Sequence, residues 1–163
     1  MNKLEELEKK YKELGEEIER LKSQSGERCR CDLGCEYFYI DDDGDIQSVD
    51  DNDWGCDEIK FDMGNYFKTK DEAYKVLDKI LIYNKLRDLA LRLNKGEPVD
   101  WKNENINKYY IYAHCHNDGT KVLSWSYNQH CKEIGNIYCL NPDFFSVALD
   151  EIGEEDLMKL FEE

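Results

Sequence analysis

Two groups of cysteine and histidine residues have the side chains best suited to chemistry. The first has the spacing Cys29-x-Cys31-x3-Cys35, and Cys56 would supply a fourth thiolate. Four thiolates can hold a structural zinc ion in a tetrahedral site. The spacing differs from the usual pairs of Cys-x2-Cys, so it favours reduced cysteines on a linker and a first strand, with zinc as the alternative.

The second group contains two His-Cys pairs and one further histidine, namely His114, Cys115, His116, His130 and Cys131. On a strand, His114 and His116 would share one face and form a metal site completed by His130 or Cys131. A Cys-His pair for nucleophilic catalysis would need to meet in space beside a third, orienting group. The sequence has no Gly-rich phosphate loop, paired-carboxylate motif or nucleophile elbow, so we expect ordinary strand residues and no enzyme.

An acidic run extends from Asp41 to Glu58 and contains nine carboxylates but no Lys or Arg. If a hairpin holds these side chains on one face, they create a strong negative field. Such a face would imitate a phosphate backbone and bind a basic surface; the alternative is a solvated edge that prevents aggregation. The predicted partner-binding residues are Asp41, Asp42, Asp43, Asp45, Asp50, Asp51, Asp53, Asp57 and Glu58.

At the start of this run, aspartates occupy alternate positions, as the first ligands of a calcium loop do. An EF-hand counted from Asp41 requires Gly at its sixth position and Glu at its twelfth. This chain has Ile46 and Asn52 there. The sequence therefore favours a hairpin turn over a calcium site.

The composition limits the classes of partner. The chain has 163 residues, a net charge of -15 and 12% aromatic residues, which indicates a folded core. Direct binding to nucleic acid is unexpected, because it needs clustered Lys and Arg. No apolar run approaches the roughly 20 residues that span a bilayer, and the charged N-terminus is unlike a signal peptide. We therefore expect no membrane association and a cytoplasmic location.

The N-terminal residues 1–24 have the pattern of a coiled-coil helix. Apolar side chains recur at alternating spacings of three and four residues, which forms a heptad seam. We expect this seam to pair with a second copy of the chain, giving a homodimer; the alternative is packing on the chain's own domain. The predicted oligomerisation residues are Leu4, Leu7, Tyr11, Leu14, Ile18 and Leu21.

Two later segments repeat the same order of features. Trp54 and Trp125 are each followed ten residues later by a Gly-Asn pair, and a helix follows, the first from about 70 to 94. Before each Trp, an aromatic run leads to an Asp-Gly pair, which is a strong hairpin signal. The matching pairs are Gly64-Asn65 with Gly135-Asn136, and Asp43-Gly44 with Asp118-Gly119.

The predicted fold is α+β, with an N-terminal coiled-coil-like helix followed by two related hairpin-strand-helix modules. An oligomerisation helix and a Cys-containing linker come first, and a second linker separates the two modules. The predicted boundaries are 1–24 for the helix, 25–35 and 95–106 for the linkers, and 36–94 and 107–163 for the modules.

A further set of residues follows a pattern that extends from Tyr37 to the end of the chain. It consists of Trp54, the run from Gly64 to Ala73, Trp101, the run from Lys108 to Ile111, the run from Gly135 to Tyr138, and the run from Ile152 to Glu155. In these residues the chain resembles small accessory proteins encoded by phages and prophages of Gram-positive bacteria. The Cys-rich segment from Cys29 to Cys35 departs from that pattern. The resemblance implies a setting of phage–host conflict, in which small acidic proteins often inhibit host defence, as anti-CRISPR proteins do.

The predicted function is therefore that of a phage-encoded interaction protein. It would inhibit a host defence or nucleic-acid-handling protein, such as a CRISPR effector, by binding its basic surface in the bacterial cytoplasm. No cofactor is expected. The alternatives are a small zinc-binding module or metal-dependent enzyme that uses the Cys and His groups, and a structural phage component.

Overall fold

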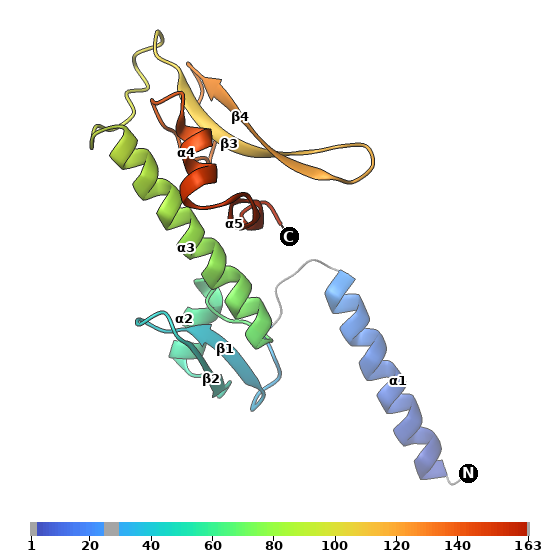
Figure 1. Ribbon diagram of the computed structural model, residues 1–163. Coiled ribbons are helices and arrows are strands. Elements are labelled where there is room, and N and C mark those ends of the chain that lie inside the picture. The colour runs from blue at the N-terminus through green and yellow to red at the C-terminus, as the bar shows by residue number, and fades with distance from the viewer. Residues whose placement is uncertain (1–2, 25–29, 163) are drawn as a thin grey trace. The chain divides into compact units, whose positions relative to one another are not determined.

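Helices and antiparallel hairpins follow one another along the chain, which confirms the α+β class. The computed structural model describes residues 3–24 and 30–162. Contacts divide the chain into two units, Met1–Lys70 and Asp71–Glu163. The elements in these described ranges (Figure 1) are α1 (Lys3–Gln24), β1 (Glu36–Ile40), β2 (Ile46–Asp50), α2 (Gly55–Asp62), α3 (Lys70–Leu93), β3 (Lys108–Cys115), β4 (Lys121–Asn128), α4 (Phe144–Glu151) and α5 (Glu154–Lys159).

The β1–β2 hairpin turns around the side chain of Asp41. Its Oδ1 accepts hydrogen bonds from the backbone N–H groups of Asp43 (3.0 Å) and Asp45 (2.9 Å). Gly44 has a φ of 84°, which side chains with a Cβ rarely adopt. The stretch is a hairpin turn of the Asx type, and Asp41 is committed to it.

A short third segment pairs with the first strand of each hairpin. Phe67 exchanges two backbone hydrogen bonds of 2.8 Å with Phe38 of β1. Cys139 exchanges two with Tyr109 of β3, at 2.7 and 2.9 Å. Both partners lie shortly after a Gly-Asn pair, so the two segments have similar backbone pairing.

The side chains of the two Gly-Asn pairs have different partners. Asn65 accepts a hydrogen bond from the Ile40 N–H (2.8 Å) and donates one to the Ile40 carbonyl (2.7 Å). Asn136 instead donates to Oε2 of Glu133 (2.9 Å). Asn65 therefore extends the strand pairing at the end of β1, and Asn136 braces its own loop.

Helix α2 has no matching helix in residues 129–143 of the second segment. It begins directly after Trp54, whereas Trp125 lies inside β4 and pairs with Ile111. The two tryptophans are therefore not structurally equivalent, and matching them was wrong. The reason is the distance from the hairpin turn, since Trp54 follows Gly44 by ten residues and Trp125 follows Gly119 by only six.

The core of the second unit is formed by apolar side chains of its helices and its hairpin. Leu86 and Leu89 of α3 pack with Ile111 of β3 and Leu123 of β4. This places α3 with the second hairpin, which differs from the predicted module 36–94. The sequence shows the apolar stripe of α3, but it does not show which hairpin packs against that stripe. The remaining buried members of this core are Ala90, Cys139, Phe144, Ala148 and Leu157.

Helix α1 carries part of the predicted stripe on its exposed surface. Leu7 and Leu14 are exposed by 56% and 59%, Tyr11 by 82% and Ile18 by 44%. The side chains of Leu4 and Leu21 lie outside the described residues. Pairing through this stripe remains a prediction.

Candidate functional site

The nine predicted partner-binding carboxylates are divided between the surface and the interior of the first unit. Asp51 and Asp57 are buried, with 1% and 2% exposure, and Asp41 is half-buried in the hairpin turn. The prediction that Asp51 and Asp57 bind a partner at the surface was therefore wrong, because a partner cannot reach buried side chains. The acidic surface consists of the six exposed members: Asp42, Asp43, Asp45, Asp50, Asp53 and Glu58.

Asp51 is held by a cation, a phenol and a backbone amide. Arg30 donates from Nε to Oδ2 (3.0 Å) and from Nη2 to Oδ1 (2.5 Å). The hydroxyl of Tyr66 donates to Oδ2 (2.7 Å), and the N–H of Asp53 donates to Oδ1 (2.9 Å). A buried carboxylate with this set of donors is fully hydrogen-bonded.

These donors keep Asp51 charged. The hydrogen bonds from Arg30 act most strongly and outweigh the opposing effect of burial, so the pKa of the Asp51 carboxyl falls to about 2. Arg30 also donates from Nη1 to Oδ1 of Asp53 (2.9 Å), which ties one exposed carboxylate to the buried one. Arg30, which also binds the buried Asp51, therefore fixes the position of the Asp53 side chain on the acidic surface.

Asp57 occupies a second buried position at the start of α2. It accepts hydrogen bonds from the hydroxyl of Tyr37 (2.8 Å) and from the N–H groups of Trp54 (3.0 Å) and Asn52 (3.2 Å). Burial acts to raise its pKa, but these three donors outweigh burial and the net shift is downward. Asp57 thus fastens the first turn of α2 to β1.

The two tyrosines that donate hydrogen bonds to these carboxylates pack on each other. The rings of Tyr37 and Tyr66 are stacked, with centroids 4.0 Å apart and planes at 13°. Burial and the neighbouring carboxylates raise the pKa of both hydroxyls, which therefore remain protonated donors. Sequence reasoning missed these residues and Arg30, although an Arg shortly before a long acidic run and two aromatic runs were visible signals.

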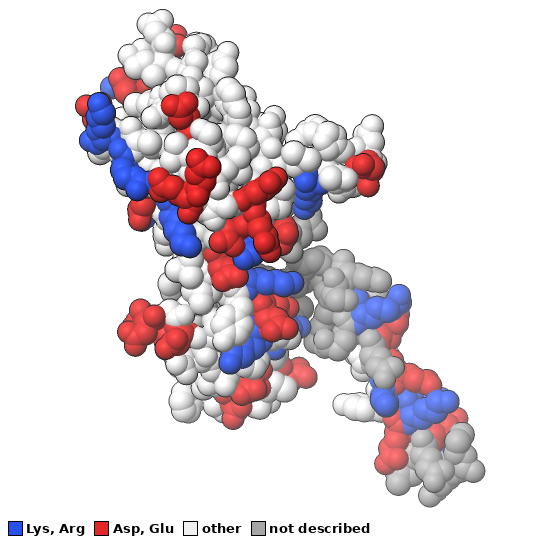
Figure 2. All heavy atoms as spheres, in the orientation of Figure 1, with Lys and Arg blue, Asp and Glu red and all other residues white. Residues whose placement is uncertain are grey.

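Acidic residues are most in excess over basic ones in residues 30–70 of the first unit. Residues 30–70 contain twelve Asp and Glu but only four Lys and Arg, whereas residues 71–163 contain seventeen and eleven. Acidic side chains gather at the β1–β2 turn in the space-filling view (Figure 2). The field around this unit therefore favours positively charged partners.

Large apolar side chains are exposed next to these carboxylates in the sequence. Trp54 is 66% exposed, Ile59 59% and Met63 78%. Ile59 and Met63 are one helical turn apart, so they share a face of α2. Exposed Glu58 and Asp62 adjoin them. Aromatic and Met side chains are enriched at protein interfaces, so this combination indicates more than a solvated charged edge.

The predicted zinc ligands have other contacts or lie apart. Sγ of Cys31 lies 2.7 Å from the hydroxyl of Tyr66 and donates to the carbonyl of Cys35 (3.4 Å). Cys35 and Cys56 are exposed free thiols, and Cys29 lies outside the described residues. Within the described ranges, no group of three or more His, Cys, Asp or Glu side chains is placed to hold a metal ion. The described thiols therefore do not fit a four-thiolate site.

In the predicted histidine and cysteine group, only two of the three histidine rings are shown in contact with each other. The rings of His114 and His116 are 5.0 Å apart, at 89° to each other. His130 lies with Nδ1 3.8 Å from Oε2 of Glu104, and Sγ of Cys115 donates to the carbonyl of His116 (3.6 Å). The two neighbouring histidines are side by side, but their arrangement supplies no oriented nucleophile.

Comparisons of the chain with protein families, curated proteins and solved structures found no match. Among the helices in the described ranges, none is long and apolar enough to cross a membrane. The function is therefore inferred from the surface of the chain itself.

Proposed function

We propose that this chain is an interaction protein that inhibits a nucleic-acid-handling protein by binding its basic surface. The observation that carries the proposal is the concentration of exposed carboxylates between Asp42 and Glu58, in a stretch, residues 30–70, with only four Lys and Arg. Proteins that handle nucleic acid expose clustered Lys and Arg for phosphates. Carboxylates fixed on a folded unit can occupy the same cations.

The buried carboxylates support the proposal by making the acidic surface rigid. Asp51 joins the end of β2 to Arg30, and Asp57 joins α2 to β1 through Tyr37. Side chains presented on a rigid unit lose less conformational entropy on binding than side chains on a flexible tail. A fixed acidic surface is therefore a better competitor for a groove than a disordered acidic segment.

The apolar side chains Trp54, Ile59 and Met63 would add affinity that charge alone does not supply. Exposed ion pairs are worth little individually, whereas buried aromatic and apolar anchors carry most of the binding energy of an interface. The preferred partner therefore has Lys and Arg around an apolar contact area. This favours a protein partner over a purely polyelectrolyte one.

The biological setting follows from the resemblance to phage accessory proteins. We propose a phage-encoded inhibitor of a host defence protein, a CRISPR effector being one candidate, which acts in the bacterial cytoplasm by binding rather than by catalysis. Pairing of α1 helices in a homodimer would present two acidic surfaces at once. Two linked surfaces raise the effective concentration for a partner with two basic sites.

A capture experiment with matched variants tests this function. The tagged chain is used to capture proteins from a Gram-positive host lysate, in parallel with Asp42→Asn/Asp43→Asn/Asp45→Asn and a control. The control, Asp71→Asn/Asp150→Asn/Glu155→Gln, removes three exposed charges from the second unit. It therefore has the same net charge as the turn variant. Each captured protein is then assayed for nucleic-acid binding or cleavage in the presence of the chain.

The proposal predicts a nucleic-acid-handling protein that is captured by the wild type and the control and is lost with the turn variant. That protein should also be inhibited by the wild type. A captured set that is identical for the three chains, or a captured enzyme whose activity does not change, would contradict it.

A further inference from the structure

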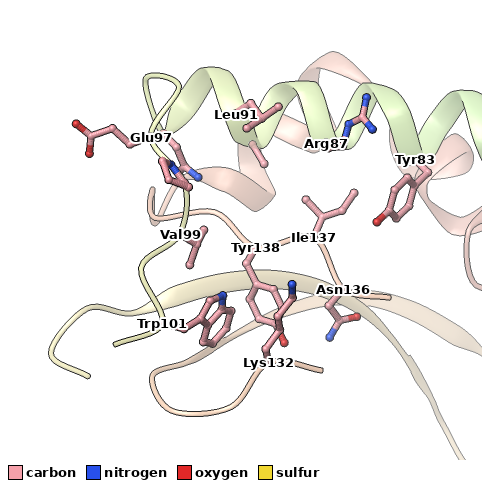
Figure 3. A pocket seen from close by; sticks show the side chains of 13 residues that line it. Tyr83, Arg87, Leu91, Glu97, Val99, Trp101, Lys132, Asn136, Ile137 and Tyr138 are labelled. Carbon is pink, nitrogen blue, oxygen red and sulfur yellow. The ribbon is translucent and has the colours of Figure 1, made fainter. Parts of the chain in front are cut away.

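The second unit contains a pocket whose lining differs in charge from the rest of this acidic chain. Its volume is about 220 Å³. Tyr83 and Arg87 line it from α3, Trp101 from the segment before β3, and Lys132 and Ile137 from the segment after β4 (Figure 3). Two stretches that are far apart in the sequence, residues 83–101 and 132–138, thus form one pocket within residues 71–163.

Asn94 places a buried polar group in the pocket lining. It is only 7% exposed, and its Oδ1 accepts hydrogen bonds from the Leu140 N–H (2.8 Å) and from Sγ of Cys139 (3.3 Å). These two bonds fix the orientation of the amide, so Nδ2 is the free end. No described residue accepts a hydrogen bond from Nδ2, and Asn94 lines the pocket. Among the described residues no fully buried side-chain nitrogen or oxygen lacks a hydrogen-bond partner, so Nδ2 is reached by solvent and can donate to a ligand or to water.

The aromatic wall of the pocket is held in place from behind. Trp101 and Tyr138 pack edge to face, with centroids 4.8 Å apart at 87°. Nζ of Lys108 lies 5.4 Å from the centre of the Trp101 ring and is fixed by the carbonyls of Asn103 (2.5 Å) and Gln129 (2.9 Å). Lys108 is fully buried and Tyr138 is only 7% exposed, so the contacts that hold the wall exist before a ligand binds.

Two cations and one carboxylate line the pocket. Arg87 and Lys132 are the cations, and the carboxylate of Glu97 points away from the pocket (Figure 3). Nε of Arg87 lies 3.7 Å from Oδ1 of Asp88, and both side chains are exposed, so this ion pair is weak and Arg87 can turn toward a ligand. In a chain of net charge -15, two cations beside an aromatic wall favour an anion.

We propose that this pocket binds a small molecule that carries one aromatic ring system and one anionic group. The ring would pack against Trp101 and Ile137, the anion would pair with Arg87 and Lys132, and Nδ2 of Asn94 would donate a hydrogen bond. Ligand pockets for drug-sized molecules have volumes of roughly 300 to 1,000 Å³, so this one suits a smaller molecule. The pocket lies within the second unit and is independent of the proposed role of the acidic surface.

The test uses the full chain, labelled with nitrogen-15, and phenyl phosphate as the probe. Titration should shift the amide signals of Trp101 and Ile137 in a saturable way. Phenol, which has the same ring without the anion, should bind about tenfold more weakly, equivalent to about 1.4 kcal/mol. The variant Arg87→Gln/Lys132→Gln should weaken phenyl phosphate binding by a similar factor.

The matched control is Lys75→Gln/Lys85→Gln, which removes two exposed charges of α3 that lie outside the pocket. It should retain the affinity of the wild type. The inference is overturned if phenyl phosphate produces no saturable shifts around the pocket. It is also overturned if the control variant loses as much affinity as the pocket variant, which would mean non-specific attraction of anions.

Discussion

Arg30 donates two hydrogen bonds to the carboxylate of Asp51, from Nε to Oδ2 at 3.0 Å and from Nη2 to Oδ1 at 2.5 Å. The backbone reinforces the pair, since the carbonyl of Asp51 accepts from the Gly34 N–H (2.7 Å) and its N–H donates to the Cys35 carbonyl (2.9 Å). The segment that precedes β1 is thereby fastened to the end of β2. These hydrogen bonds fix the backbone that carries the exposed carboxylates.

Removal of the cation from this pair should destabilise the first unit. Arg30→Ala leaves the buried Asp51 without its strongest partner, which lowers the free energy of unfolding. Urea titration followed by the backbone amide signals of residues 30–70 measures this change. Arg87→Ala, which truncates an exposed Arg in the second unit, serves as the control and should change stability by less than about 0.5 kcal/mol. Equal stability of Arg30→Ala and the wild type would show that the pair does not hold the unit.

Acid should weaken the first unit through the same carboxylate. The pKa of Asp51 is about 2 in the folded chain and about 3.9 in an unfolded one, so the unfolded chain binds more protons between these values. The stability from Asp51 is therefore complete above about pH 5 and is lost as the pH falls toward 2. The lowered pKa of Asp57 acts in the same direction.

Unfolding free energies of the wild type measured between pH 6 and pH 2 test this dependence. The variant Asp51→Asn should start lower and fall less steeply with pH, because the titrating group has been removed. Identical slopes for the two chains would assign the acid sensitivity to other groups.

The sequence was sufficient for the α+β class and for the largest elements. The helix expected from about 70 to 94 is α3, because its apolar spacing is long and regular, and each Asp-Gly pair lies in a hairpin turn. Helix α2 was not expected, since it is short and the apolar side chains of Ile59 and of Met63, the residue that directly follows the helix, are exposed. Hydrophobic periodicity detects a helix only when the apolar face is turned to the core.

The candidate site was predicted only in part for a similar reason. A run of acidic residues in the sequence does not distinguish Asp50, which is exposed, from its neighbour Asp51, which is buried. The distinction depends on partners 21 and 15 residues away, Arg30 and Tyr66. Local composition therefore predicts the sign of the field but not which carboxylates create it.

The exposed stripe of α1 predicts a change in oligomeric state when it is interrupted. Leu14→Asp should convert a dimer to a monomer, because it places a charge in the centre of the apolar seam. A chain that begins at Glu27 should behave in the same way. Light scattering coupled to gel filtration measures the mass, and Lys9→Asp, at the heptad position farthest from the seam, is the control for Leu14→Asp. A wild-type chain that is already monomeric, or a truncated chain that remains dimeric, would exclude pairing through α1.

The exposed apolar side chains of α2 should contribute to partner binding without contributing to folding. Ile59→Ser/Met63→Ser is expected to leave the urea midpoint of the first unit nearly unchanged, since both side chains are more than half exposed. The affinity for the captured partner should fall by about tenfold or more, as for anchors at the centre of an interface. Leu81→Ser, an exposed apolar residue of α3, is the control. Unchanged affinity of the α2 variant would restrict the interface to the carboxylates.

Under the proposed function, the acidic surface competes with nucleic acid for a basic site on the partner. This competition is measured by the displacement of a fluorescently labelled oligonucleotide from the captured partner as the chain is added, at two salt concentrations. The wild type should displace the oligonucleotide, and the displacement should weaken as salt rises. The affinity of Asp42→Asn/Asp43→Asn/Asp45→Asn should be at least about tenfold lower, since three exposed ion pairs at about 0.5 kcal/mol each give that factor. An oligonucleotide that stays bound at saturating chain, or a turn variant that displaces it as well as the wild type, would rule out this competition.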